Sequence, residues 1–212
     1  DLLEAVCRLH QQQHLVDDLM SLEAKQLSAQ LFQGTLMVKN NLEKFLSPSR
    51  HAIPPLPNAF FTRDAVMCVY DKAIIGSMAH KVRLTEAILL KHIFDEHPKL
   101  DSHGFHFDGT RKDNNDVTIE GGDLLVIRDD LLVIGFSERT SANGIDRLAE
   151  RLSKNKDKLD IVVVELPKIR ATIHLDMIFT MLDVDTAMNF APLITGPNKC
   201  RAFHMHCERG DI

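Results

Sequence analysis

The chain contains no tryptophan, a single tyrosine (Tyr70) and only four cysteines among its 212 residues. Scattered cysteines without a CxxC pair exclude a small disulfide-stapled secreted domain and favour reduced thiols, so we expect a cytoplasmic protein. No apolar run reaches the roughly 18 residues that a membrane-spanning helix needs. The 25 Lys and Arg residues against 30 Asp and Glu lack the basic excess of a dedicated nucleic-acid binder. We therefore expect neither a membrane nor a nucleic-acid partner.

Hydrophobic residues make up 44% of the chain and charged residues 26%, which fits a globular protein and excludes global disorder. The unusual abundance is 11 histidines, which raises the question of a metal site. The positions considered as metal ligands are His103, His106, Cys200, His204, His206 and Cys207. On a strand, His204 and His206 would share one face while Cys207 points to the other, and the paired spacing of structural zinc sites is not met. The sequence therefore predicts no metal.

The pattern of apolar residues divides the chain into two parts. Residues 1–50 carry apolar residues at helical spacing and predict a helical subdomain, a hairpin broken at Gly34 with Leu36–Leu46 as the return helix. A proline-rich connector follows at 53–58, which suits neither a helix interior nor a central strand. Residues 51–212 are predicted to form a mixed α/β domain.

The second part repeats a pattern. Strands are predicted at 66–70, 73–75, 123–127, 131–136, 161–166, 178–182 and 202–206, helices at 79–97 and 144–153, and a polar loop at 103–115. The order strand, strand, helix, strand is complete once, between residues 117 and 166, and partial on either side. Weak repetition of this kind is typical of propeller-like arrays.

Polar clusters stand at the ends of the predicted strands, where a rigid scaffold positions side chains that remain accessible. Taken singly, each has a structural interpretation. Glu120-Gly-Gly-Asp123 would be a turn, Ser137-Glu-Arg-Thr140 a helix cap, and His174 a buried core histidine. Their combination along one chain is far more specific than any single cluster.

The motifs occur in the order Pro55-Leu-Pro-Asn-Ala-Phe-Phe-Thr-Arg-Asp64, Ile119-Glu-Gly-Gly-Asp123, Gly135-Phe-Ser-Glu-Arg-Thr140 and His174-Leu-Asp176. These motifs resemble those of the arginine deiminase family in their order, their spacing and their residue types, from about residue 54 to 183. The resemblance implies part of a five-bladed β/α propeller (the pentein fold) with a helical insertion. It also implies hydrolysis of L-arginine to L-citrulline and ammonia through a cysteine thiolate and an amidino-thioether intermediate, with no cofactor.

The catalytic residues that the resemblance implies are His174 as general acid and base, Glu120 orienting it, and Asp64 and Asp176 as carboxylates around the substrate. The chemistry agrees, because a planar guanidinium presents five N–H donors that carboxylates on two sides can bind with charge-assisted bonds. An acid beside such a cation stays ionised.

Substrate-binding residues follow from the same resemblance: Asn58, Arg83 and Arg139, together with Asp64 and Asp176. Arg83 and Arg139 match the family's positions for binding the substrate carboxylate, and Asn58 matches an accompanying amide contact. Two arginines of this kind favour a free amino acid over agmatine.

The family's nucleophilic cysteine follows the HLD motif at a much greater distance than this chain allows, since only 36 of the 212 residues follow Asp176. Cys207 follows a histidine at a short distance but lacks the Gly-rich segment that precedes the family's nucleophile, so we do not expect it to be that residue and leave the nucleophile unknown. We expect an incomplete chain whose unpaired strand edges favour homo-oligomers or association with another chain. Two alternatives stay open: an inactive or truncated homologue that binds a guanidinium ligand or a partner chain, and a sister amidine hydrolase or amidinotransferase.

Overall fold

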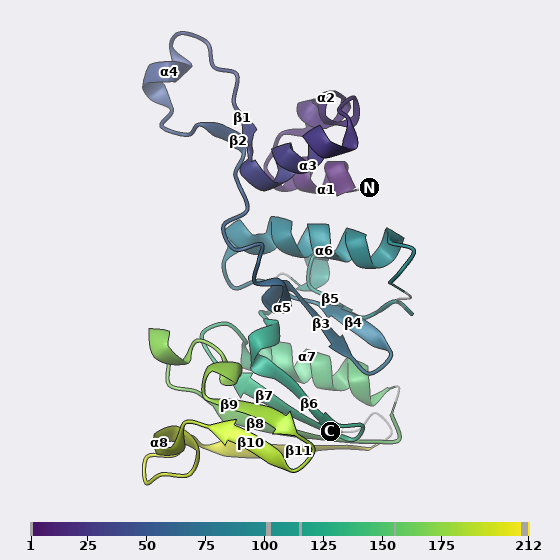
Figure 1. Ribbon diagram of the computed structural model, residues 1–212, viewed down its shortest axis with the longest axis vertical. Coiled ribbons are helices and arrows are strands. Elements are labelled where there is room, and N and C mark those ends of the chain that lie inside the picture. Colours follow the sequence, from purple (N-terminus) through teal and green to yellow (C-terminus); the bar gives the residue numbers. More distant parts are fainter. Residues whose placement is uncertain (1, 101–102, 115, 155, 209–211) are drawn as a thin grey trace.

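Two successive stretches of the chain fold into the same strand–strand–helix–strand unit in the computed structural model, which describes residues 2–100, 103–114, 116–154, 156–208 and 212 (Figure 1). The first unit contains β3 (Val66–Val69), β4 (Lys72–Ile75), α6 (Leu84–Glu96) and β5 (Phe105–Asp108). The second contains β6 (Leu124–Arg128), β7 (Leu131–Phe136), α7 (Ala142–Ser153) and β8 (Lys158–Glu165). In each unit the first two strands form an antiparallel hairpin and the third strand runs parallel to the second. The predicted repeat is therefore present in full twice.

The predicted polar loop at 103–115 is wrong, because β5 lies inside it; Asn115 itself falls outside the described residues. Polar neighbours on both sides of Phe105–Asp108 hide the strand in the sequence. In the structure Phe107 is fully buried and His106 nearly so, because β5 pairs with β4 in a sheet covered by other elements. The residues of β5 do alternate between apolar and polar, but over four positions only, the shortest stretch that indicates a strand.

The N-terminal part is helical over α1 (Leu2–Leu9), α2 (Val16–Met20) and α3 (Ala24–Gln33), which share one hydrophobic cluster, and α1 packs on α6 (Figure 1). The predicted return helix at Leu36–Leu46 is wrong. Gly34 has a φ of +87°, and a Cβ there would lie 2.8 Å from the backbone nitrogen of Pro55. The chain therefore leaves the helix at Gly34 as β1 (Thr35–Leu36), pairs with β2 (His51–Ile53), and keeps only one helical turn, α4 (Glu43–Leu46).

The sheet of the second unit continues beyond the repeat. Strand β11 (Ala202–Glu208) pairs antiparallel with β8, which gives the order β11-β8-β7-β6. A separate hairpin of β9 (Phe179–Asp183) and β10 (Thr186–Asn189) precedes the short helix α8 (Ala191–Ile194). Among the described residues the sheets have two to four strands and none closes on itself, so the structure shows an α/β fold of several small sheets. No described helix is long and apolar enough to span a bilayer.

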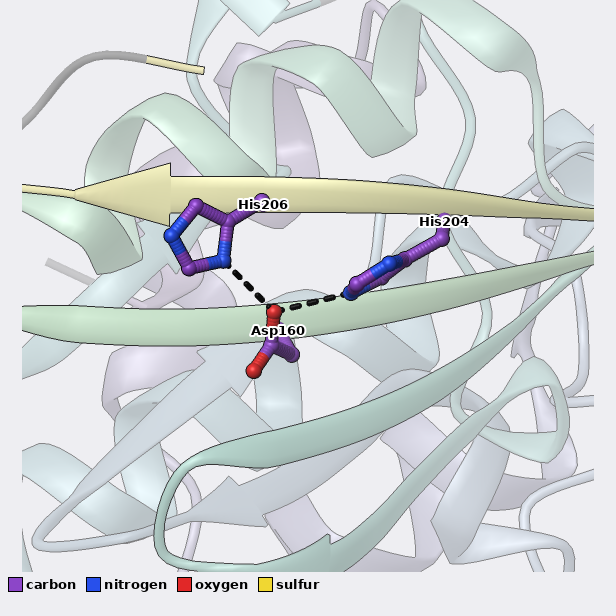
Figure 2. A group of neighbouring side chains, drawn as sticks. All are labelled: Asp160, His204 and His206. Carbon is purple, nitrogen blue, oxygen red and sulfur yellow. Dashed lines mark hydrogen bonds and ion pairs between the residues drawn. The ribbon is translucent and has the colours of Figure 1, made fainter.

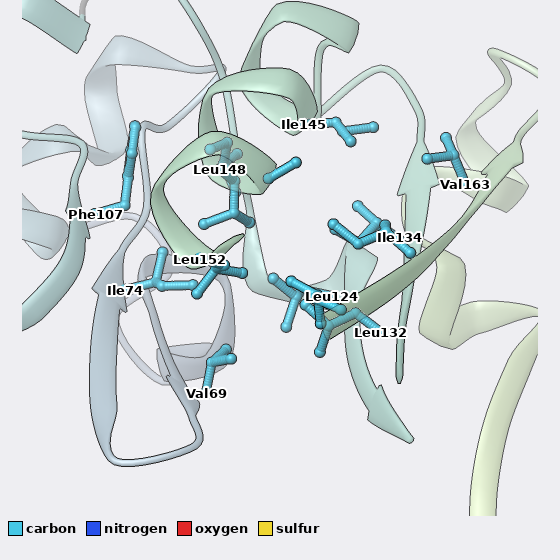
Figure 3. Packing of buried hydrophobic residues seen from close by; sticks show 14 of the residues in the cluster. Val69, Ile74, Phe107, Leu124, Leu132, Ile134, Ile145, Leu148, Leu152 and Val163 are labelled. Atoms are coloured by element: carbon cyan, nitrogen blue, oxygen red, sulfur yellow. The ribbon is translucent and has the colours of Figure 1, made fainter. Parts of the chain in front are cut away.

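One hydrophobic cluster joins the two units. Its residues include Val69, Ile74 and Phe107 from the first unit and Leu124, Leu132, Ile134, Ile145, Leu148, Leu152 and Val163 from the second (Figure 3). Because α7 lays its apolar side on this cluster, the largest of the hydrophobic clusters belongs to both units. The shared core fixes the loops of one unit relative to those of the other.

Truncating Leu148 to alanine is expected to destabilise the protein by about 3 kcal/mol, since the side chain is fully buried and leaves a cavity. Urea unfolding of the two proteins measures the difference. Val184→Ala serves as the control, because Val184 is 93% exposed and its loss should change stability by about 0.5 kcal/mol or less. Equal unfolding midpoints for the two variants would show that α7 does not hold the units together.

Candidate active site

The residues singled out by the motifs come from loops at one end of the two units. Asp64 lies in α5 (Thr62–Ala65), directly before β3, and Arg83 lies in a 3-10 turn after β4. Glu120 precedes β6 and Arg139 follows β7, while His174 lies beyond the end of β8. In an antiparallel hairpin, the start of the first strand lies beside the end of the second strand, at the same end of the sheet. The topology therefore gathers these loops.

A single antiparallel bridge between Ser77 and Ile119 joins the first unit to the second at this end. The bridge brings Glu120 against the backbone of the first unit, where its Oε1 accepts a hydrogen bond from the amide of Ala79 at 3.0 Å. Glu120 is therefore positioned by both units at once.

His174 and Glu120 form a buried pair. The Nε2 of His174 lies 3.0 Å from Oε2 of Glu120, with the two residues 7% and 0% exposed. Beneath the ring, a Cβ at Gly122 would lie 2.5 Å from Nδ1 of His174, so only glycine leaves room for the imidazole. The second glycine of the Glu120-Gly-Gly-Asp123 motif thus has a direct steric explanation.

The electrostatics of this pair favour its charged form. Burial alone would raise the pKa of Glu120, but the hydrogen bond with His174, the Ala79 amide and the charge of Arg139 outweigh it and hold the pKa below its usual value. Burial alone would lower the pKa of His174, but the bond to Glu120 and the charges of Asp123 and other nearby carboxylates raise it. The histidine thus keeps its proton to higher pH than a free imidazole.

Arg83 is 4% exposed and its guanidinium is enclosed by internal partners. Nη1 donates to Oδ2 of Asp64 at 2.6 Å, and Nε donates to Oε2 of Glu86 at 2.9 Å. Nη2 also donates to the carbonyl oxygens of Phe61, at 3.2 Å, and Asn58, at 3.4 Å. Burial would lower the pKa of Arg83, but these acceptors raise it, so the group is a permanent cation.

Asp64 connects the Arg83 network to the histidine, since its Oδ1 lies 3.8 Å from Nδ1 of His174. Arg139 approaches from the other side, with Nη1 3.7 Å from Oε2 of Glu120 and a side chain that is 17% exposed. Asp176 stands further out, where its Oδ2 lies 3.7 Å from Nε of Arg63. Burial raises the pKa of Asp176.

Glu86 was not singled out from the sequence, and Asp123, Ser137 and Thr140 were named only as members of motifs, without a role in the site. Glu86, which binds Arg83, lies only three residues after it, a spacing that would have suggested the pair. Asp123 accepts hydrogen bonds from Oγ of Ser137 at 2.6 Å and from the amide of Leu175 at 2.9 Å, and burial raises its pKa to about 6. Thr140 accepts a bond from the amide of Glu120. Asp123 therefore ties the histidine loop to the loop after β7.

The arrangement combines a charged imidazole–carboxylate pair, further carboxylates and one partly accessible arginine. Such a set suits a small cationic substrate that also carries a negative group. Among solved structures, a dimethylarginine dimethylaminohydrolase from Pseudomonas aeruginosa complexed with citrulline is similar in fold, with a TM-score of 0.51, 24% identity, and 68% of this chain and 52% of that chain covered. The N-terminal domain of ArgZ, a cyanobacterial arginine dihydrolase, gives a TM-score of 0.53 at 22% identity, with 66% and 46% covered. The fold is thus that of α/β proteins in the dimethylarginine dimethylaminohydrolase and arginine dihydrolase group.

Residues 4–208 match the family model of arginine deiminase, so the chain belongs to the arginine deiminase family. An arginine deiminase of Bacillus cereus is 37% identical over 146 residues, which cover 68% of this chain and 35% of the relative. One of Bacillus cytotoxicus is 36% identical over the same length. The matched segment thus spans about a third of the curated relatives.

Proposed function

We propose that the site hydrolyses the guanidinium group of L-arginine, which yields L-citrulline and ammonia. The observation that carries this proposal is the buried pair of His174 and Glu120, with Oδ1 of Asp64 near the other ring nitrogen of the histidine. Family membership and the 37% identity to arginine deiminases support the same reaction.

His174 is the proton carrier in this proposal. A cysteine thiolate attacks the central carbon of the guanidinium, and the departing nitrogen takes a proton from the imidazolium and leaves as ammonia. Water then attacks the amidino-thioether, His174 accepts a proton from it, and citrulline and the thiolate are released. The raised pKa of His174 suits the first step, because the group begins as an acid. Glu120 fixes the ring and stabilises its charge.

Asp64 and Asp176 bind the substrate guanidinium. Only Oδ2 of Asp64 is bonded to Arg83, so Oδ1, on the histidine side, is the oxygen that would receive a substrate N–H. Asp176 has a looser partner in Arg63, at 3.7 Å on the surface, which a buried and desolvated substrate cation can displace.

The substrate carboxylate needs a positive partner. Arg83 can serve only if it gives up Asp64 or Glu86, since both carboxylates hold its guanidinium. We therefore assign the main contact with the substrate carboxylate to Arg139. Arg83 and Asn58 remain further candidates for this contact, and they also hold Asp64 and Glu86 in place.

The nucleophile stays unassigned. Cys207 is fully buried in the core shared by both units, and burial raises the pKa of its thiol. A thiol in such a position gives little thiolate at neutral pH, so the short His206-Cys207 sequence supports no catalytic role.

We further propose that the two repeated units are blades of a five-bladed propeller, with residues 1–50 as a helical subdomain and 51–212 as the partial catalytic domain. Within the described residues, no strand pairs with the outer edge of β6 or of β11, which supports association with further strands or with a second copy of the chain. A cytoplasmic location fits the reduced cysteines, since Cys7, Cys68, Cys200 and Cys207 are all free.

The reaction is tested by incubating the intact gene product with L-arginine and measuring citrulline and ammonia separately. We expect the two products in equal amounts, and agmatine to be turned over far more slowly. Ammonia without citrulline, or equal rates with both substrates, would contradict the proposal.

Arg139→Gln is expected to raise KM for L-arginine by about tenfold to a hundredfold with a smaller change in kcat, because the lost contact is to a part of the substrate that does not react. Arg201→Gln is the matched control, since Arg201 also pairs with a glutamate, Glu165, but on the surface. Unchanged KM in Arg139→Gln would remove this arginine from substrate binding.

A further inference from the structure

Asp160, His204 and His206 form a cluster on the face of the four-stranded sheet that points away from the shared core (Figure 2). The Oδ1 of Asp160 lies 2.8 Å from Nε2 of His204 and 2.8 Å from Nδ1 of His206. Asp160 pairs with Leu131 at the start of β7, whereas the candidate active site follows the end of β7. The cluster thus stands at the opposite end of the sheet from that site.

The strand register places the three side chains together. His206 is directly opposite Asp160 in the antiparallel pair of β11 and β8, and His204, two residues earlier, lies diagonally across on the same face. The next residue, Cys207, points to the other face and into the core. Seven consecutive residue pairs hold the two strands, so the backbone positions of the cluster are fixed before any ligand binds.

We propose that Asp160, His204 and His206 bind a divalent transition-metal cation of the zinc type. One atom from each residue is available, and the three atoms all lie within 4.8 Å of one another. A tetrahedral cation with bonds of about 2.0–2.1 Å needs its ligands roughly 3.3 Å apart. The 2.8 Å separations therefore have to open only slightly when the cation replaces the ring protons that now point at Asp160.

The surroundings of the cluster support a cation. The second ring nitrogen of His206, Nε2, lies 4.0 Å from Oε2 of Glu208. A carboxylate behind a ligating histidine orients the ring and increases its basicity. Lys158, with Nζ 4.0 Å from Oδ2 of Asp160, carries a positive charge that opposes the cation.

The ligand chemistry selects among cations. Two imidazoles and one carboxylate suit zinc, nickel, copper or cobalt, whereas magnesium and calcium prefer a shell of oxygen ligands. The side chains of His204 and His206 are 62% and 47% exposed, so water completes the coordination. Because its ligands come from β8 and the edge strand β11, the bound cation would fasten that edge.

Zinc and cobalt titrations of the chelator-treated protein test the site. Calorimetry should show one Zn²⁺ bound per chain, with affinity reduced at least tenfold in Asp160→Asn and in the double variant His204→Gln/His206→Gln. The control is His14→Gln/His97→Gln, which removes two exposed histidines elsewhere and should bind as the wild type does. Circular dichroism of each variant confirms that the fold is retained.

Cobalt identifies the ligand atoms. We expect a Co²⁺ spectrum without the thiolate charge-transfer band, which excludes the exposed Cys68 as a ligand. Three results would overturn the proposal. They are zinc binding that is equal in the wild type and both cluster variants, a thiolate band in the Co²⁺ spectra of the wild type and the cluster variants, and no zinc binding at all.

Discussion

The His174→Ala variant of the intact gene product is expected to turn over L-arginine about a hundredfold to ten-thousandfold more slowly than the wild type, the range typical of a lost general acid–base. The imidazole is the only group among the named site residues that both contacts Glu120 and faces Asp64 with its second nitrogen. Without it, the leaving nitrogen must take its proton from water. Steady-state citrulline formation measures the loss.

His106→Gln is the matched control for this variant. His106 is also a buried histidine near a carboxylate, with Nε2 3.8 Å from Asp71, but it lies on β5 and binds the carbonyl of Val69. We expect it to affect stability and to leave the turnover per folded molecule unchanged. Equal turnover in His174→Ala and wild type would remove His174 from the mechanism.

Glu120→Gln is expected to lower kcat by about tenfold to a hundredfold and to move the alkaline limb of the pH–rate profile to lower pH. The carboxylate raises the pKa of His174, so a neutral amide lets the imidazolium lose its proton at lower pH. A general acid works only in its protonated form, which fixes the direction of the shift. The pH dependence of kcat measures it directly.

The same pair links stability to pH with a definite sign. The raised pKa of His174 gives stability that is present at low pH and is lost as the pH rises through the folded-state value. The lowered pKa of Glu120 gives stability that is lost as the pH falls through its folded-state value.

The control for the pH–rate experiment on Glu120→Gln is Glu165→Gln, which changes a surface carboxylate paired with Arg201 and should leave the pH–rate profile unchanged. A pH–rate profile of Glu120→Gln that coincides with the wild type would contradict the assigned role.

Much of the repeated unit could be predicted because its signals are local. The hairpin of β6 and β7 follows from two apolar runs around Arg128-Asp129-Asp130, and α7 begins where the Ser141 side chain accepts a bond from the amide of Gly144. The return helix at Leu36–Leu46 and the loop over β5 were wrong for a common reason. In both, a tertiary contact decides the structure: the close approach of Pro55 to Gly34, and the burial of β5 beside β4.

The motifs named several residues that the structure brings together, among them Asp64, Glu120 and His174, but their pairing could not be predicted. The family resemblance implied one role for Arg83 and Arg139, yet Arg83 is enclosed by Asp64 and Glu86 whereas Arg139 is partly accessible. Ion pairs between loops of different units depend on how those loops fold back, which residue spacing does not encode. The same holds for Asp160, which only the strand register brings to His204 and His206.

Calorimetric titration of the His174→Ala variant of the intact gene product, whose slow turnover separates binding from hydrolysis, tests most directly whether this is a guanidinium site for a free amino acid. We predict one L-arginine bound per chain, agmatine bound at least tenfold more weakly because it lacks the carboxylate, and a loss of this preference when Arg139→Gln is added to His174→Ala. Absence of L-arginine binding, or equal affinity of the His174→Ala variant for the two ligands, would contradict the account.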